Sequence, residues 1–355
     1  MLLCVAPGVA SAQQYVMTLL GFAPYSYTIN GVNGLNNNGD VVGYDSVIDG
    51  AYLYHGGVVS ALGMTSGVGV AINNSGYIAV RSWGPDQHSY LYTPGRLPRL
   101  VSHFTDIGTL GGSGGLNNTG QTVAMDMNDS RTIVGASTVS GATPPLWHAF
   151  SWSNGQMTDL GVLQLWGMST ANSINNLGQI VGDTVGNDGY DRAFQMVNGY
   201  MTDMDPANHN YDSSAVAIND AGQIVVVTNL AWRIQFISRG VWSIVAYRGP
   251  TYYTRIYSNG TYTDLGNLGY TEGTYGYSIN SAGDVVGYSL DSNNRAHAFL
   301  YHAGTMVELN NVVTNLSGWR VSIATRINDL GQIVCWVRNN TTNEAQTAVL
   351  TPILD

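Results

Sequence analysis

Histidine and aspartate recur at fixed positions of a repeated segment, and these residue types could hold a metal ion. The histidines are His88, His148 and His297, and carboxylates recur in stretches similar to T-D-L-G, at Asp106, Asp159, Asp203 and Asp264. A metal site needs ligands that converge on one ion. Because equivalent positions of different repeats are spaced apart, we expect packing and hydrogen bonding from these residues, and no metal site.

Signals for other catalytic chemistry are weak. The chain contains no Lys, which removes Schiff-base chemistry, pyridoxal enzymes and the lysine of a phosphate loop. The glycine-rich stretch 111–115 is not followed by a basic residue, and there is no G-x-S-x-G nucleophile elbow. The sequence therefore nominates no catalytic residue.

Two short stretches resemble fragments of calcium-binding loops, NDGYD at 187–191 and DSNN at 291–294. Neither has the alternating acidic spacing and distal bidentate Glu of a strong site. We expect no cofactor, with a weak extracellular Ca²⁺ contact as the alternative.

The composition favours an all-β protein. Gly (44), Tyr (22) and Trp (8) are abundant, whereas charged helix formers are scarce, since 10% of the residues are charged. The net charge is −10, with all 13 basic residues being Arg, so we expect neither nucleic acid nor an anionic membrane as a partner. No apolar run is long enough to span a membrane.

One turn motif occurs seven times and organises the whole chain. Its clearest copy is INNLGQIVG at 174–182, and the Asn that begins each turn lies at Asn36, Asn73, Asn128, Asn175, Asn219, Asn280 and Asn328. A spacing of about 40 to 60 residues is typical of repeat architectures. The Asn and Gly residues supply the positive φ angles that a hairpin turn needs.

A second hairpin follows the first in most repeats. Its turns are the Asn-Gly pairs at 154–155, 198–199 and 259–260, which are strong hairpin signals. Two hairpins give four strands per unit, the number in one blade of a β-propeller. We therefore predict a seven-bladed β-propeller with four-stranded antiparallel blades.

The ends of the chain favour a closed ring over an open array. The last repeat lacks a convincing fourth strand, and residues 15–21 (YVMTLLG) resemble the fourth strand of an internal repeat. Pairing of this N-terminal strand with the last blade would leave no exposed sheet edge. An eighth blade around residues 116–121 is the alternative, although this segment is better interpreted as a loop insertion.

The combination of IN-x-x-G-Q-I-V-G, H-A-F and N-G-x-M-T-D-L-G resembles the HAF repeat family of bacterial secreted proteins. The tripeptide itself stands at 148–150 and 297–299. The likeness covers nearly all of residues 13–355 and departs in the first, second and fifth repeats. The family has no established common activity, so the resemblance implies export and repeat boundaries more than chemistry.

Residues 1–12 (MLLCVAPGVASA) resemble the end of a signal peptide that lacks its charged start. Cleavage after Ala12 would remove Cys4 and leave Cys335 alone, as a buried thiol in an apolar strand. We therefore expect a protein located outside the cell, at its surface or in the periplasm, with residues 13–355 forming one propeller domain.

The predicted disc has one face of tight turns and one face of longer, variable loops, where binding sites tend to lie. Aromatic side chains beside carboxylates on the loop face suit sugar rings, because ring faces stack and hydroxyls need acceptors. The candidate binding residues are Trp83, Trp147, Trp166, Tyr190, Tyr211, Trp232, Trp242, Tyr275 and Trp319. The alternatives are aromatic packing between blades and, for the irregular segment 232–242, a decorated blade edge.

These observations predict an exported, non-catalytic binding propeller that recognises glycans or cell-envelope components. One alternative is a carbohydrate-active hydrolase or lyase that uses Asp residues of the loop face, which would need paired carboxylates about 5 to 9 Å apart. The other alternative is a purely structural surface protein. The sequence does not indicate an oligomeric state.

Overall fold

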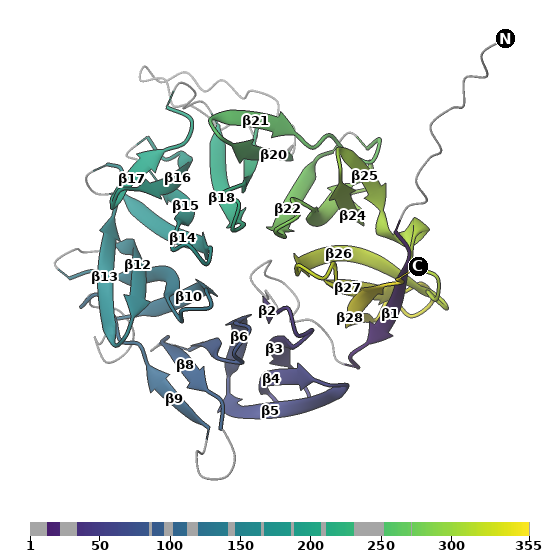
Figure 1. Cartoon of the computed structure of the whole chain (residues 1–355), viewed down its shortest axis with the longest axis horizontal. Helices are drawn as coiled ribbons and strands as arrows, with labels where there is room; N and C mark the ends of the chain where they lie inside the picture. Colours follow the sequence, from purple (N-terminus) through teal and green to yellow (C-terminus); the bar gives the residue numbers. More distant parts are fainter. Residues whose placement is uncertain are drawn as a thin grey trace, which may run out of the picture.

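The protein folds into a ring of seven four-stranded antiparallel sheets, as predicted (Figure 1). The structure is a computed structural model, and it describes residues 13–21, 34–84, 87–95, 102–111, 120–140, 146–164, 167–185, 188–206, 211–230, 252–270 and 272–354. Residues 1–12 and the segment 232–242 lie outside the described residues. Among the described residues, the one helical element is a single 3₁₀ turn, η1 (Leu309–Asn311).

Six blades each consist of four consecutive strands, numbered from the axis outward. Blade 1 contains β2 (Gly34–Leu35), β3 (Val41–Asp45), β4 (Gly50–His55) and β5 (Val58–Thr65). Blade 2 contains β6 (Gly67–Ile72), β7 (Ile78–Ser82), β8 (Ser89–Thr93) and β9 (His103–Asp106). Blade 3 contains β10 (Thr122–Met127), β11 (Ile133–Thr138), β12 (Trp147–Ser153) and β13 (Gln156–Gly161).

The second half of the ring follows the same plan. Blade 4 contains β14 (Met168–Ile174), β15 (Ile180–Val185), β16 (Asp191–Val197) and β17 (Tyr200–Asp203). Blade 5 contains β18 (Asp212–Ile218), β19 (Ile224–Asn229), β20 (Tyr252–Ser258) and β21 (Thr261–Asp264). Blade 6 contains β22 (Thr274–Ile279), β23 (Val285–Leu290), β24 (Ala296–His302) and β25 (Thr305–Glu308).

Blade 7 closes the ring with strands from both ends of the chain. It contains β26 (Trp319–Ile327), β27 (Ile333–Asn339), β28 (Ala345–Pro352) and, as its outer strand, β1 (Tyr15–Leu19). Figure 1 shows purple β1 beside yellow β28, and the register runs from Tyr15 opposite Pro352 to Leu19 opposite Ala348. The predicted closure is therefore confirmed, and the ring has seven members rather than eight.

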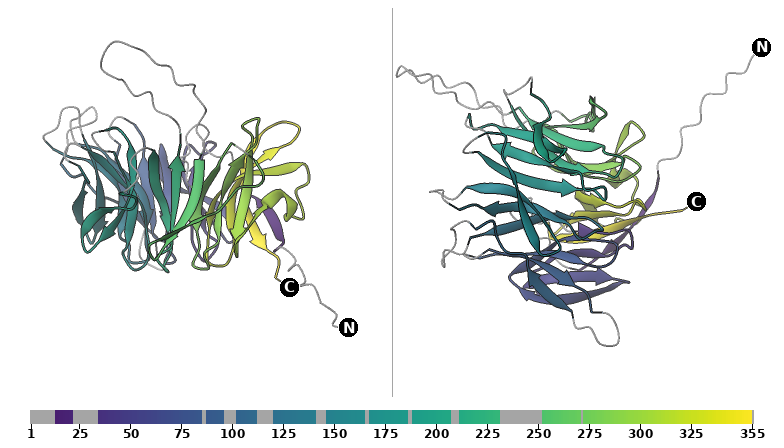
Figure 2. Two further views of the ribbon diagram at one scale, coloured as in Figure 1. Left: turned by 90° about the horizontal axis from the view of Figure 1, so that it is seen from above. Right: turned by 60° about the vertical axis from the view of Figure 1, so that its left-hand side comes forward.

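The hairpin turns adopt the backbone conformations that their sequences predict. Asn154, Asn198 and Asn259 have φ values of 51°, 53° and 49°, and the Gly after each also has a positive φ. Two consecutive residues in the left-handed region define the turn type that suits the right-handed twist of a two-residue hairpin. These turns and the turns of the repeated Asn lie on one face of the disc, called here the turn face; the opposite face is the loop face (Figure 2).

The core is divided into clusters that lie between neighbouring blades. One cluster joins blades 3 and 4 through Val134, Ala149, Ala171, Ile174, Ile180 and Phe194. The Phe of each H-A-F tripeptide, Phe150 and Phe299, is fully buried. Cys335, the one cysteine in the described residues, is also buried, and burial raises the pKa of its thiol. Packing of apolar side chains between blades therefore stabilises the ring.

Candidate functional site

The seven repeated asparagines form a closed ring of hydrogen bonds around the axis. In each one, the side-chain Nδ2 donates to the backbone carbonyl of the equivalent Asn in the next blade, from Asn36 to Asn73 and finally from Asn328 back to Asn36, over 2.9–3.5 Å. The Oδ1 atom accepts backbone N–H groups of its own turn, as Asn175 does from Leu177 and Gln179. The repeated Asn is thus a cap and an inter-blade link at once.

The next residue of each turn forms a second polar ring at the mouth of the axis. Asn74 donates its backbone N–H to Asp129, and Asp129 donates its own to Asn176, over 2.9 Å in both cases. These side chains line an open hollow of about 190 Å³ on the turn face. Because the polar atoms of these residues hydrogen-bond to one another across neighbouring blades, we attribute the hollow to the contacts that hold the ring together.

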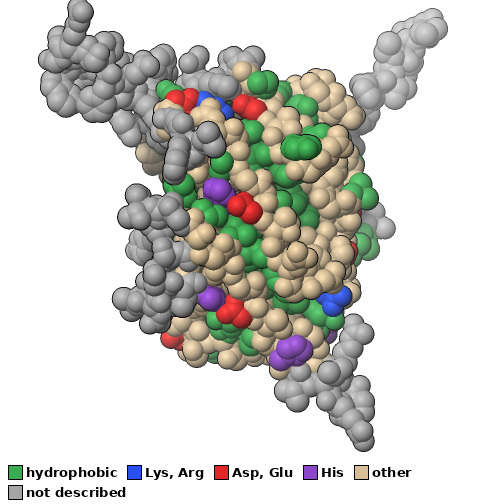
Figure 3. Space-filling model, turned by 90° about the vertical axis from the view of Figure 1, so that its left-hand side faces the viewer, with side chains coloured by type: hydrophobic (Ala, Val, Ile, Leu, Met, Phe, Trp, Pro, Cys, Tyr) green, Lys and Arg blue, Asp and Glu red, His purple; other side chains and the backbone are tan. Residues whose placement is uncertain are grey.

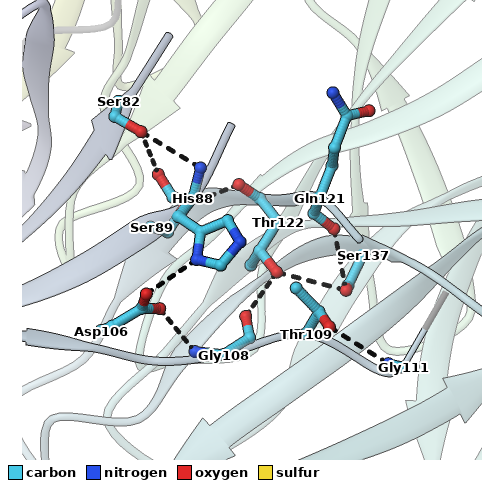
Figure 4. Close-up of polar contacts among 10 residues, drawn as sticks. All are labelled: Ser82, His88, Ser89, Asp106, Gly108, Thr109, Gly111, Gln121, Thr122 and Ser137. Atoms are coloured by element: carbon cyan, nitrogen blue, oxygen red, sulfur yellow. Dashed lines mark hydrogen bonds and ion pairs between the residues drawn. The ribbon is translucent and has the colours of Figure 1, made fainter. Parts of the chain in front are cut away.

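Each repeated histidine pairs with a carboxylate of its own blade. His88 Nδ1 lies 2.7 Å from Asp106 Oδ2, and His148 Nδ1 lies 2.9 Å from Asp159 Oδ2. Figure 4 shows the first pair, in which Asp106 also accepts the backbone N–H of Gly108, and Figure 3 shows His beside acidic side chains at two places on the outer wall. The predicted hydrogen-bonding role of these residues is confirmed.

A cavity on the axis is lined by side chains that the repeat does not share. The inner strands of blades 2 to 7 carry a β-bulge just before the repeated Asn, and bulges redirect side chains. The residue two places before the Asn is Gly34, Ala71, Asp126, Ser173, Ala217, Ser278 or Arg326. Asp126 and Arg326 are therefore unique charged residues in a ring of small ones, beside a cavity of about 170 Å³.

Asp126 is held by hydrogen bonds from two blades. Its carboxylate accepts Ser173 Oγ at 2.8 Å and the backbone N–H groups of Ile174 and Met127 at 3.0 and 2.8 Å. Burial raises the pKa of this carboxyl against the opposing effects of Arg326 and these donors. Asp126 is the one carboxylate among the described residues that line the axial cavity.

A second carboxylate, Asp183, is half-buried behind this cavity on β15. It accepts Asn172 Nδ2 at 2.6 Å and Ser214 Oγ at 2.7 Å, and burial raises its pKa. Asn172 lines the axial cavity, so one bulge supplies partners to both carboxylates through Asn172 and Ser173. This arrangement was not predicted from the sequence; its signal is the departure from small residues before the repeated Asn.

The six predicted aromatic residues that the structure describes have different surroundings. Trp83 packs edge-on against Tyr44 of blade 1, with ring centroids 4.8 Å apart. Tyr211 donates its hydroxyl to Asp205 at 2.6 Å, and Tyr275 stacks on Tyr288 at 5.9 Å. Trp147 and Tyr190 are half-buried at the loop-face ends of blades 3 and 4. Trp166, Trp232 and Trp242 lie outside the described residues.

Trp319 differs from these because it lines a groove of about 280 Å³ between blades 6 and 7. The groove opens where β24 and β26 begin, which places it on the loop face. The described residues that line it are Arg295, Ala296, His297, Glu308, Asn310, Leu316, Trp319, Arg320, Val321 and Asn340. It combines an indole face with guanidinium, carboxylate and amide groups.

The polar floor of this groove is preorganised. His297 Nδ1 lies 2.9 Å from Glu308 Oε1, and its Nε2 lies 3.3 Å from Asp291 Oδ2. Asn310 donates Nδ2 to Glu308 at 3.0 Å and accepts the backbone N–H of Val321 at 2.8 Å. Glu308 therefore already has protein partners, whereas no hydrogen bond from a described residue engages the Asn340 side chain.

In the two stretches that resemble calcium loops, Asp188 and Asp291 already have protein partners. Asp188 pairs with the buried guanidinium of Arg192. Asp291 accepts the backbone N–H groups of Asn293 and Arg295 at 2.8 and 2.9 Å, in a turn of its own. In the described part of the chain, no group of three or more His, Cys, Asp or Glu is placed to hold a metal ion.

Comparisons with known proteins leave the function open. No protein-family model and no curated protein matches the chain. Among described residues, no helix is long and apolar enough to cross a membrane.

The solved structures that are similar to the chain at low identity include the following three. The β-propeller domain of the Trilobed protease from Pyrococcus furiosus has 11% identity and a TM-score of 0.42, covering 82% of this chain and 80% of that one. TolB from Acinetobacter baumannii has 14% identity and a TM-score of 0.42, and the match covers 90% of this chain and 78% of that one. A puromycin-hydrolyzing peptidase from Mycobacterium tuberculosis has 11% identity and a TM-score of 0.45. This match covers 89% of this chain but about half, 51%, of that one. The propeller assignment itself rests on the strand pairing described above.

Proposed function

We propose that this chain is an exported, non-catalytic binding propeller of the HAF repeat type, which recognises a glycan of the cell envelope or the extracellular space through the groove between blades 6 and 7. The observation that carries the proposal is Trp319, an indole at the wall of a groove that also presents guanidinium and amide groups. Aromatic faces stack on sugar rings, and polar groups around them bond to hydroxyls.

The HAF assignment is supported by the way the repeat signals are used. His148 and His297 of the two H-A-F tripeptides each pair with the carboxylate at the end of the following strand, and the repeated Asn builds the ring. Export is supported by the small residues at 10–12. A fusion of residues 1–12 to a reporter enzyme that is active only outside the cytoplasm tests it; a reporter that stays inactive contradicts export through this segment.

The hydrolase alternative needs two facing carboxylates, and no such pair is found among the described residues that line the axial cavity or the groove. The axial cavity has Asp126 and the groove has Glu308, each bonded to protein donors. Two carboxylates across a cleft are the basis of most glycosidase chemistry. The geometry of the described residues therefore favours binding over hydrolysis.

A glycan array probed with the wild-type chain and Trp319→Ala tests the binding function. We expect the wild type to bind a defined set of oligosaccharides and Trp319→Ala to bind them roughly fivefold more weakly, because loss of one stacking ring costs on the order of 1 kcal/mol. Trp147→Ala, which removes a half-buried indole of blade 3 on the same face, serves as the matched control. No binding to any sugar, or equal loss in both variants, would contradict the proposed groove.

A further inference from the structure

Three arginines gather around the groove of blades 6 and 7. Arg295 and Arg320 line it, and Arg338 lies directly opposite Arg320 in the antiparallel pair of β26 and β27. Like charges directly opposite each other destabilise a strand pair. In a chain of net charge −10 with 13 arginines, this concentration of positive charge runs against the overall composition.

No carboxylate neutralises these three guanidinium groups within the described residues. Elsewhere in the ring Arg192 pairs with Asp188, and Arg255 lies 4.0 Å from Asp205. No carboxylate oxygen of a described residue lies within ion-pair distance of Arg295, Arg320 or Arg338. The nearby Asp291 and Glu308 contact His297 instead.

The electrostatics of Arg320 reflect this lack of counter-charge. Partial burial lowers the pKa of its guanidinium, and the positive charges of Arg295 and Arg338 lower it further. An anion placed between Arg295 and Arg320 would offset that repulsion. The planar guanidinium fork matches a carboxylate with two parallel hydrogen bonds.

We infer that the ligand of this groove is an acidic glycan, with a sugar carboxylate bound by Arg295 and Arg320 while the sugar ring stacks on Trp319. The inference rests on the proposed glycan-binding function and specifies its ligand class. Trp319 and Arg320 at the start of β26, and Arg295 just before β24, all line this one groove.

The test compares one uronic-acid oligosaccharide with its carboxyl methyl ester, which has the same rings and linkages but no charge. We expect the acid to bind the wild type at least tenfold more tightly than the ester in low salt, and this preference to shrink as salt is added. Arg320→Gln and, at an exposed site, Arg295→Gln should each bring the acid close to the affinity of the ester, with the ester affinity unchanged.

Two further variants separate the outcomes. Trp319→Ala should weaken both ligands, and Arg131→Gln, which removes a positive charge on the turn face, should weaken neither. Equal affinities for acid and ester, or a preference that survives both groove substitutions, would overturn the inference and leave glycan binding standing. If neither form binds while the glycan array shows neutral ligands, the ligand class is wrong; if the array is also blank, the proposed function fails with it.

Discussion

Substitution of a single repeated asparagine should lower the free energy of unfolding by more than the loss of one small side chain suggests. Asn175 makes four hydrogen bonds while almost fully buried: Nδ2 donates to the carbonyl of Asn219 at 2.9 Å and to Gln179 Oε1 at 2.6 Å, and Oδ1 accepts the N–H groups of Leu177 and Gln179. Asn175→Ala keeps the backbone but removes the turn cap and the link to blade 5 together.

The size of the effect follows from those four contacts. A typical hydrogen bond contributes about 1 kcal/mol net, and more where a buried partner is left unsatisfied, so we expect a loss of about 3–5 kcal/mol in the free energy of unfolding. Unfolding entropy of about 2 cal/mol/K per residue gives about 0.7 kcal/mol/K for this chain. The melting temperature should therefore fall by about 4–7 °C.

Thermal unfolding followed by circular dichroism measures this shift, and the neighbouring residue provides the control. Asn176 is exposed and bonds to Asp220 and Asp129, so Asn176→Ala should cost about 0.5 kcal/mol and leave the melting temperature nearly unchanged. Asn175→Asp retains the accepting oxygen of the cap but not the donor, and should remain well below the wild type. Equal shifts for the alanine variants at 175 and 176 would refute the linking role of the buried ring.

Three other outcomes follow from the packing and the buried charge. Gly287→Ala should destabilise the fold by about 2–3 kcal/mol in urea unfolding, because the new Cβ would lie 2.0 Å from the carbonyl oxygen of Tyr275; a variant as stable as the wild type would show that the strands can separate freely. Burial raises the pKa of Asp183 in the folded protein, so the wild type should lose stability as pH rises from the unfolded pKa, about 4, to the folded pKa, and should lose no more above it. Asp183→Asn cannot titrate, so its stability relative to the wild type should increase over that pH range. A stability difference that does not change from about pH 4 to 8 would contradict this. Deletion of residues 13–21 should expose the edge of β28 and remove buried Tyr15 and Met17, giving oligomers or aggregates in light scattering, whereas a stable monomer would argue against closure by β1.

Most of the fold could be predicted from local sequence patterns. The Asn-x-x-Gly turns, the Asn-Gly hairpins and the alternation between them depend on φ angles and on side-chain direction within a few residues, which the sequence specifies directly. Ring closure could also be predicted, because residues 15–21 resemble the fourth strand of an internal repeat. The pairing of His88, His148 and His297 with nearby carboxylates was predicted only as a general hydrogen-bonding role, because the partners lie on a neighbouring strand.

The candidate sites could be predicted only in part. Trp319 was among the aromatics predicted for the loop face, but nothing local distinguishes it from Trp83, whose ring packs against Tyr44 of the neighbouring blade. The arginines around Trp319 were not recognised as a group. Their signal was the presence of Arg295, Arg320, Arg326 and Arg338 within the last two repeats.

The sequence by itself determined the blade, its repetition and the number of repeats, because each blade is built from local turns and short-range strand pairing. Only the tertiary structure decided which unrepeated side chains meet. Asp126 and Arg326 belong to blades 3 and 7, and they line the same cavity only because the ring is closed. The groove beside Trp319 likewise exists only where two blades adjoin, since the angle between neighbouring sheets, and not any local pattern, brings Arg295 of blade 6 to Arg320 of blade 7.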